Sequence, residues 1–135
     1  MNTFRLTVLE ADQPFFDGEC ISLQFPYSDG LYGIMAGHIN LIAAIVPGML
    51  RFRTAKGEER IASVSRGIIK VENGDVLILI DSAEDPDEID VKRAEREAAE
   101  AAEAMLQRQT PVAYRAAEAK YARALNRLKV YNKVK

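Results

Sequence analysis

The chain has 135 residues, of which 48% are hydrophobic and 28% charged, and its formal net charge at pH 7 is −2. This length suits one ordinary domain or two small units that share a surface, and the apolar fraction is that of a globular protein. A net charge near zero gives no electrostatic reason to expect nucleic-acid binding. No apolar run approaches the roughly 20 residues of a membrane span, so we expect no such segment.

The N-terminus, the one cysteine and the one histidine narrow the possible classes of protein further. The N-terminus has no basic region followed by an apolar stretch, so we expect no secretory signal. The one cysteine, Cys20, cannot form an internal disulfide, and the one histidine, His38, cannot make a zinc site with it. A reducing cytoplasmic setting is therefore expected.

The composition changes near residue 84. All eight glycines lie between Gly18 and Gly74, whereas residues 85–135 hold twelve alanines and no glycine. The net charge also divides, with −4 on residues 1–84 and +2 on residues 85–135. Because glycine punctuates strands and alanine favours helices, we expect a β-rich unit at 1–84 and a helical unit at 85–135.

Alternating apolar residues predict strands in the first unit. Phe4, Leu6 and Val8 alternate with polar residues, which is the period of a half-buried strand, and the pattern returns from Ile21 to Phe25. Further strands are predicted at 41–46, 49–52, 61–64, 68–72 and 75–80. Seven or more short strands at this spacing indicate a sandwich or a barrel.

Two turn signals lie between these strands. Pro47-Gly48 separates two of them. Asn73-Gly74 tolerates the positive φ angles of a tight hairpin, so the strands on either side of it should pair antiparallel. The following run, Val76 to Ile80, is apolar throughout, which predicts a strand covered on both faces.

Two helices are predicted in the second unit. The segment 85–88 (Asp-Pro-Asp-Glu) starts the first with a capping side chain, a proline and acids near the positive end of the helix dipole, although a later acid in the segment could cap instead. This helix should run to about Arg108, and Thr110-Pro111 starts the second by the same logic. The short connection makes the helices antiparallel neighbours, each about 30 Å long.

The predicted contact between these helices is thin. One apolar stripe on each helix recurs at spacings of three and four, comprising Val91, Ala94, Ala98, Ala101 and Met105 on the first and Tyr114, Ala117, Tyr121, Ala124, Leu128 and Tyr131 on the second. A buried alanine methyl contributes about 0.8 kcal/mol, against roughly 2 for a leucine side chain. The stripes alone favour a permanently closed hairpin, and a hairpin that detaches or opens is the competing hypothesis.

Several short motifs follow one another in a recognisable order. They are Phe16-Asp17-Gly18 (an F-x-G turn), 29–38 (containing G-x-x-G-I-x-x-G-H), Pro47-Gly48, 65–71 (S-R-G-I-I-K-V, similar to S-G-G-x-x-E-V), 81–84 (ending in A-E) and 89–94 (I-D-x-x-R-A). Over almost the whole chain this series resembles the epsilon subunits of bacterial F-type ATP synthases, and the segment 29–38 is its most specific part.

The resemblance implies an architecture, a role and partners. The implied fold is a flattened β-sandwich of about ten strands at 1–84, followed by an antiparallel two-helix hairpin at 85–135. The implied role is that of a non-catalytic central-stalk subunit, which couples proton flow to ATP synthesis. The sandwich would bind the gamma subunit and the ring of c subunits. The helices would either lie folded on the sandwich or rise along gamma towards the alpha and beta subunits, and the raised form would restrain ATP hydrolysis. The implied location is peripheral, at the cytoplasmic face of the cell membrane.

By the same resemblance, one group of residues is a candidate nucleotide site: Glu84, Asp90, Arg93, Arg123 and Arg127. ATP would act there as a regulatory ligand, and no cofactor is required. Asp90 and Arg93 share one helix face and the two later arginines share another, so an antiparallel hairpin could bring the four together. Arginine suits phosphate because its planar fork donates in pairs.

Two features count against this nucleotide site. Glu97 and Glu100 stand where ATP-binding members tend to carry a further arginine, and these acids would repel a triphosphate. The alternative is a set of surface ion pairs, such as Asp90 with Arg93 or Arg127.

The basic end of the second helix, 123–135, is expected to meet an acidic surface on beta.

A second candidate site precedes the first glycine-rich motif. Its residues are expected to form an exposed loop on the c ring, or else an ordinary turn: Ser28, Asp29, Gly30, Leu31 and Tyr32. We expect His38 to be a hydrogen-bonded structural residue and Cys20 a small buried apolar one.

The sequence offers no catalytic motif. It lacks a G-x-S-x-G elbow, a phosphate-binding G-x-x-x-x-G-K-[ST] loop and a histidine cluster. Two other classes compete with the rotor subunit. One is a free-standing β-sandwich adaptor whose helices dock unrelated partners, and the other is a small ATP-sensing domain that acts alone.

Overall fold

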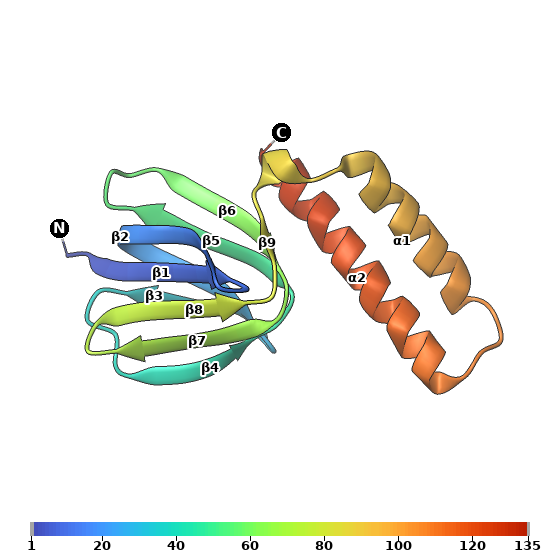
Figure 1. Ribbon diagram of the computed structural model, residues 1–135, viewed down its shortest axis with the longest axis horizontal. Helices are drawn as coiled ribbons and strands as arrows, with labels where there is room; N and C mark the ends of the chain where they lie inside the picture. The colour runs from blue at the N-terminus through green and yellow to red at the C-terminus, as the bar shows by residue number, and fades with distance from the viewer. Residues whose placement is uncertain (1, 135) are drawn as a thin grey trace. The chain divides into compact units, whose positions relative to one another are not determined.

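The computed structural model describes residues 2–134, so that Met1 and Lys135, the last residue of the predicted basic end, lie outside it. The chain separates into two compact units, one ending at Glu84 and the other starting at Asp85 (Figure 1). The strands of the first unit are β1 (Phe4–Glu10), β2 (Gln13–Tyr27), β3 (Gly30–Met35), β4 (Leu41–Ile45), β5 (Gly48–Thr54), β6 (Glu59–Val64), β7 (Gly67–Glu72), β8 (Asp75–Ile80) and β9 (Ala83–Glu84). The second unit holds a 3₁₀ turn, η1 (Pro86–Glu88), and two helices, α1 (Val91–Met105) and α2 (Pro111–Val134).

The strands form one continuous sheet that folds into two layers. Their order is β4-β7-β8-β1-β2-β5-β6-β9, and β3 also pairs with β2. The 15-residue strand β2 belongs to both layers, because its first half pairs with β1 and its second half with β3 and β5. The predicted β-sandwich followed by two helices is confirmed, with nine strands in the described residues rather than about ten.

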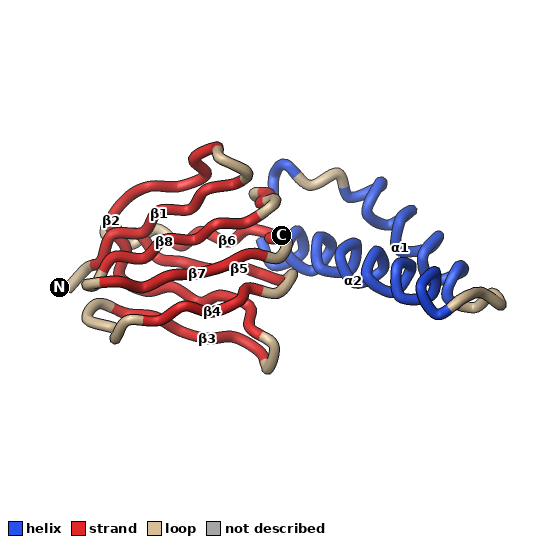
Figure 2. The backbone as a smooth tube through the Cα atoms, turned by 60° about the horizontal axis from the view of Figure 1, so that its bottom comes forward, coloured by secondary structure: helices blue, strands red, loops and turns tan. Residues whose placement is uncertain are grey.

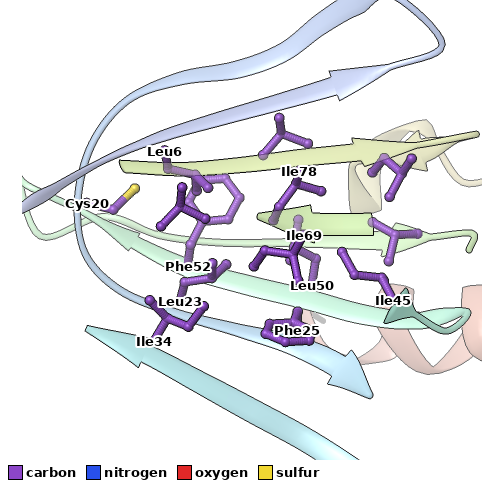
Figure 3. Close-up of a cluster of buried hydrophobic side chains, with 14 of the residues drawn as sticks. Leu6, Cys20, Leu23, Phe25, Ile34, Ile45, Leu50, Phe52, Ile69 and Ile78 are labelled. Carbon is purple, nitrogen blue, oxygen red and sulfur yellow. The ribbon is translucent and has the colours of Figure 1, made fainter. Parts of the chain in front are cut away.

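The core lies between the two layers (Figure 3). The first layer contributes Leu6, Ile45, Ile69 and Ile78, and the second contributes Leu23, Phe25, Ile34, Leu50 and Phe52. Each of these side chains is at most 2% exposed. Cys20 is fully buried where β2 passes between the layers, as predicted. Because all of these residues precede residue 85, the sandwich has a hydrophobic core of its own.

The two tightest turns of the first layer depend on positive φ angles. Asn73 (φ 52°) and Gly74 (φ 86°) connect β7 to β8, so the predicted hairpin is confirmed. Ala11 (φ 44°) and Asp12 (φ 74°) connect β1 to β2. The turn predicted at Phe16–Gly18 is therefore wrong. This segment lies inside β2, where pairing with β1 satisfies its backbone groups.

The prediction that β8 is covered on both faces is also wrong. Val76, Ile78 and Ile80 point into the core, but Leu79 on the opposite face is 45% exposed. The strand is apolar on two sides, yet only one side is packed within the described chain.

The first predicted helix begins later than expected. Pro86–Glu88 form only one 3₁₀ turn, in which the Asp85 amide donates to Glu88 Oε1 at 2.9 Å. Ile89 then leaves the helical region (ψ 123°), and α1 starts after Asp90. Asp90 Oδ1 accepts a hydrogen bond from the Arg93 amide at 3.1 Å, so Asp90 is the N-cap of α1.

The reversal between the helices lies close to where it was predicted. The helix α1 ends at Met105 rather than near Arg108, and Gln109 Nε2 donates to the Ala104 carbonyl at 2.5 Å. The helix α2 starts at Pro111 as predicted, with Thr110 Oγ1 accepting from the Ala113 amide at 3.1 Å. Figure 2 shows the short loop that returns the chain, so that α2 runs back beside α1.

The packing between the helices is as thin as the stripes predict. Buried residues on α1 are Ala94, Ala98 and Ala101 only, and Ala124 is the buried alanine of α2. The predicted stripe missed Val130, which is fully buried.

Candidate functional site

The predicted contact loop is the tip of the β2–β3 hairpin. Tyr27 pairs with Gly30, so only Ser28 and Asp29 form the turn, and Gly30 to Tyr32 already belong to β3. The predicted five-residue loop is therefore too long, because the residues after the turn are held by pairing with β2. Leu31 is 62% exposed and Tyr32 is 37% exposed, so the start of β3 presents apolar side chains to solvent.

His38 is a structural residue, as expected. Its Nδ1 lies 2.8 Å from the Ile39 carbonyl oxygen, and its Nε2 lies 3.2 Å from the Tyr32 hydroxyl. Since a carbonyl can only accept, Nδ1 carries the proton, and in the neutral ring Nε2 accepts from the tyrosine. The two rings also meet edge to face with centroids 5.8 Å apart. His38 thus fixes the tyrosine at the hairpin tip.

A second surface, which is apolar, was not predicted from the sequence. It lies on the outer side of the first layer and is called here the outer apolar face: Leu9, Ile42, Ala44, Ile68, Leu77 and Leu79. Cross-strand pairs join Ala44 to Ile68, Ile68 to Leu79 and Leu79 to Leu9.

The exposure of this face distinguishes it from a core. Ile42 is 73% exposed and Ile68 is 51% exposed. Isolated soluble proteins rarely expose contiguous apolar patches of this kind unless a partner covers them. The uninterrupted apolar run of β8 could have predicted this face. A strand with two apolar faces needs a packing partner on each side, and the core covers only one of them.

The helical candidates converge only in part. Arg93 Nε lies 3.1 Å from Glu97 Oε1, and Arg127 Nη1 on α2 lies 4.0 Å from the same oxygen. The antiparallel hairpin therefore brings Arg93 and Arg127 towards one point. Asp90, by contrast, is engaged in capping α1. The alternative to a nucleotide site was a set of surface ion pairs, and Arg93 and Arg127 each form one with Glu97.

The other two nucleotide candidates are Arg123 and Glu84. Arg123 is an exposed residue one turn before Arg127 on α2. Glu84 belongs to the sandwich unit, where β9 pairs with β6 and places it opposite Ser63. Nucleotide binding by these five residues stays a prediction.

Two further properties bear on the kind of site. In residues 2–134 no group of three or more histidine, cysteine or acidic side chains is placed to hold a metal ion. Neither helix of that part of the chain combines the length and the hydropathy needed to cross a bilayer.

Both units match known protein families. Residues 3–86 match the beta-sandwich domain of the ATP synthase Delta/Epsilon chain, and residues 87–132 match its long alpha-helix domain. The ATP synthase epsilon chain of Clostridium novyi is 39% identical over 128 residues, covering 95% of this chain and 97% of that protein. The epsilon chain of Ruminococcus albus is 38% identical over 134 residues, covering 98% and 99%.

Solved structures share the fold at lower identity. A chain of the Euglena gracilis mitochondrial ATP synthase superposes with a TM-score of 0.75 at 20% identity, covering 98% of this chain and 79% of that one. A chain from the central stalk and c-ring of the Tetrahymena thermophila mitochondrial ATP synthase gives a TM-score of 0.70 at 16% identity, covering 94% and 95%. These likenesses extend over both the sandwich and the helices.

Proposed function

The chain belongs to the family of ATP synthase epsilon chains, and we propose from this premise that its sandwich binds the gamma subunit and the c ring while its helices restrain ATP hydrolysis. It is a central-stalk subunit and not a catalytic one. Membership over both units is the observation that carries the proposal.

The outer apolar face supports the assignment of gamma. Its row of aliphatic side chains crosses four neighbouring strands, β4, β7, β8 and β1. A partner that covered Ile42, Ile68 and Leu79 would remove apolar surface from water and gain about 25 cal/mol per Å². We assign this face to gamma because a stalk subunit that turns with its shaft needs a durable apolar contact.

The hairpin tip supports contact with the c ring. Ser28 to Tyr32 lie at the tip of the β2–β3 hairpin, where Leu31 is 62% exposed and Tyr32 is 37% exposed. Attachment through the c ring would hold the chain at the cytoplasmic face of the membrane without any segment of its own inside the bilayer.

The hairpin supports a restraining role through its weak internal packing and its basic end. An alanine seam allows the two helices to part at low cost. The described end of α2 carries Arg123, Arg127, Lys129 and Lys133 and no acid, which suits an acidic surface on beta. Regulation by ATP at the helical arginines is part of the same proposal.

Reconstitution tests the proposal. Complexes are assembled with the full chain or with a chain that ends at Glu84, which retains the whole sandwich core. We expect both chains to co-purify with gamma and the c ring, and we expect the truncated one to give faster ATP hydrolysis. Failure to co-purify would contradict the docking surfaces, and equal hydrolysis would contradict the restraint by the helices.

A further inference from the structure

One carboxylate lies between the two helices of the hairpin. Glu97 on α1 is only 19% exposed in its side chain, whereas Glu100 on the same helix is 61% exposed. Its Oε1 lies 3.1 Å from Arg93 Nε and 4.0 Å from Arg127 Nη1. Two guanidinium groups from different helices therefore converge on a single oxygen.

The thin packing between the helices makes the contacts of Glu97 important for closure of the hairpin. The neighbouring buried residues of α1 are alanines, which bring little apolar area to the interface. A partly buried carboxylate between two cations is also less screened by solvent than a pair at an open surface. Closure of the hairpin thus depends on Glu97 more than it would in a leucine-rich seam.

The local charge points to what else could occupy this position. The Asp90 carboxylate caps α1, and Glu97 is an acid that lies within ion-pair distance of both arginines. Two guanidinium groups within 4.0 Å of one oxygen are a donor set that recognises phosphate oxygens. We propose that Glu97 is a built-in anion, which fills the place of a phosphate group between Arg93 and Arg127 and competes with phosphate ligands for them.

This competition has a direct consequence. The hairpin closes without a ligand, and a polyphosphate can take the position between the two arginines only when the Glu97 side chain moves away. The inference rests on the proposed phosphate binding at the helical arginines, but it can fail or hold independently of assembly with gamma and the c ring.

Calorimetry on the purified full chain tests the inference, with inorganic tripolyphosphate as the probe. Glu97→Gln keeps the shape of the side chain and removes its charge. Glu103→Gln is the matched control, because it removes the same charge from an exposed position of α1. We expect Glu97→Gln to bind at least about fivefold more tightly than the wild type, the effect of losing one competing ion pair, and Glu103→Gln to match the wild type.

The double variant Glu97→Gln/Arg127→Gln should lose this gain. Equal affinity in the two single variants, or a gain that survives the loss of Arg127, would overturn the inference. Circular dichroism checks that the helices persist. If Glu97→Gln loses helix, nuclear magnetic resonance of the wild-type chain decides. The Glu97 carboxyl carbon should then shift in step with the Nε groups of both arginines, and arginine shifts without a Glu97 shift would reject the competition.

Discussion

Gly67 and Gly33 are both strand glycines, but their surroundings differ. A Cβ atom at Gly67 would overlap the Leu79 carbonyl oxygen and the Cγ2 atom of Ile80, whereas a Cβ at Gly33 would meet only the Leu23 carbonyl oxygen at 3.9 Å. The close approach of β7 and β8 therefore requires glycine at 67. No comparable contact requires it at 33.

Gly67→Ala should destabilise the sandwich by about 1–3 kcal/mol, because strands β7 and β8 must move apart to admit the methyl group. Gly33→Ala should change the free energy of unfolding by less than about 0.5 kcal/mol. Urea denaturation of both variants measures the difference. A Gly67→Ala chain as stable as the Gly33→Ala chain would show that the strands adapt freely.

Burial raises the pKa of the Cys20 thiol to about 11, with a smaller contribution from the negative charge of Glu19. The unfolded chain begins to lose this proton near the ordinary pKa of 9.0, while the folded chain keeps it. Between pH 9 and 11 the unfolded state therefore binds fewer protons, and stability falls as the pH rises.

A comparison with Cys20→Ala isolates this effect. The wild type should lose about 2 kcal/mol more stability than the variant as the pH rises from 9 to 11, although the variant starts from a lower value because of its cavity. Denaturant titrations at several pH values give both curves. Parallel curves would mean that Cys20 ionises with equal ease in both states.

Strand β8 shows how one element can carry two kinds of contact. Its even-numbered residues Val76, Ile78 and Ile80 complete the core, and its odd-numbered residues Leu77 and Leu79 join the outer apolar face. The element thus links the packing of the sandwich to the surface proposed for gamma.

Ile68→Glu should weaken binding to gamma by at least about tenfold, because the new carboxylate would be buried without a partner in the complex. Stability of the free chain should change little, since the side chain is 51% exposed. Met35→Glu, at a 64% exposed position on β3, is the control and should bind normally. Surface plasmon resonance against gamma reads out both, and equal loss in both variants would place the contact elsewhere.

Strand patterns were predictable where alternation and turn chemistry agree. Asn73-Gly74 gave the correct pairing of β7 with β8, and the alternation of β1 gave its buried and exposed faces. The first half of β2 was missed, because Pro14 and Gly18 are unusual inside strands and hide the period. The run of β8 was recognised as apolar on both sides, but the lack of a covering layer is a tertiary fact that no local pattern contains.

The helical candidates show a similar limit. Helix periodicity correctly placed Arg93 and Arg127 on facing sides of a hairpin. The sequence could not show that Glu97 would reach both of them, since this depends on the distance between the helices and on rotamers. Nor could it show that Asp90 is the cap of α1, because several acids nearby satisfy the same rule.

The molecule as a whole consists of two units whose interiors differ in kind. The sandwich buries large aliphatic and aromatic side chains, and the hairpin buries mainly alanines. Local stability follows the apolar area that each unit removes from water.

Hydrogen exchange should therefore separate the two units in the intact chain. Amides of α1 and α2 should exchange faster than those of β7 and β8, because opening the hairpin exposes less apolar surface than opening the sandwich. Mass spectrometry of peptides after exchange gives this ranking. Helices as well protected as the β core would contradict a hairpin that opens.

The length of β2 has a mechanical consequence. Fifteen residues of strand, about 50 Å when measured along the chain, run from the turn at Asp12 to the tip at Ser28 and include two bulges. Hydrogen bonds to β1, β3 and β5 brace this strand along its length. A sideways force on the tip is therefore distributed as shear over several hydrogen-bonded strand pairs at once. The sandwich should then rotate as one stiff body, with little deformation.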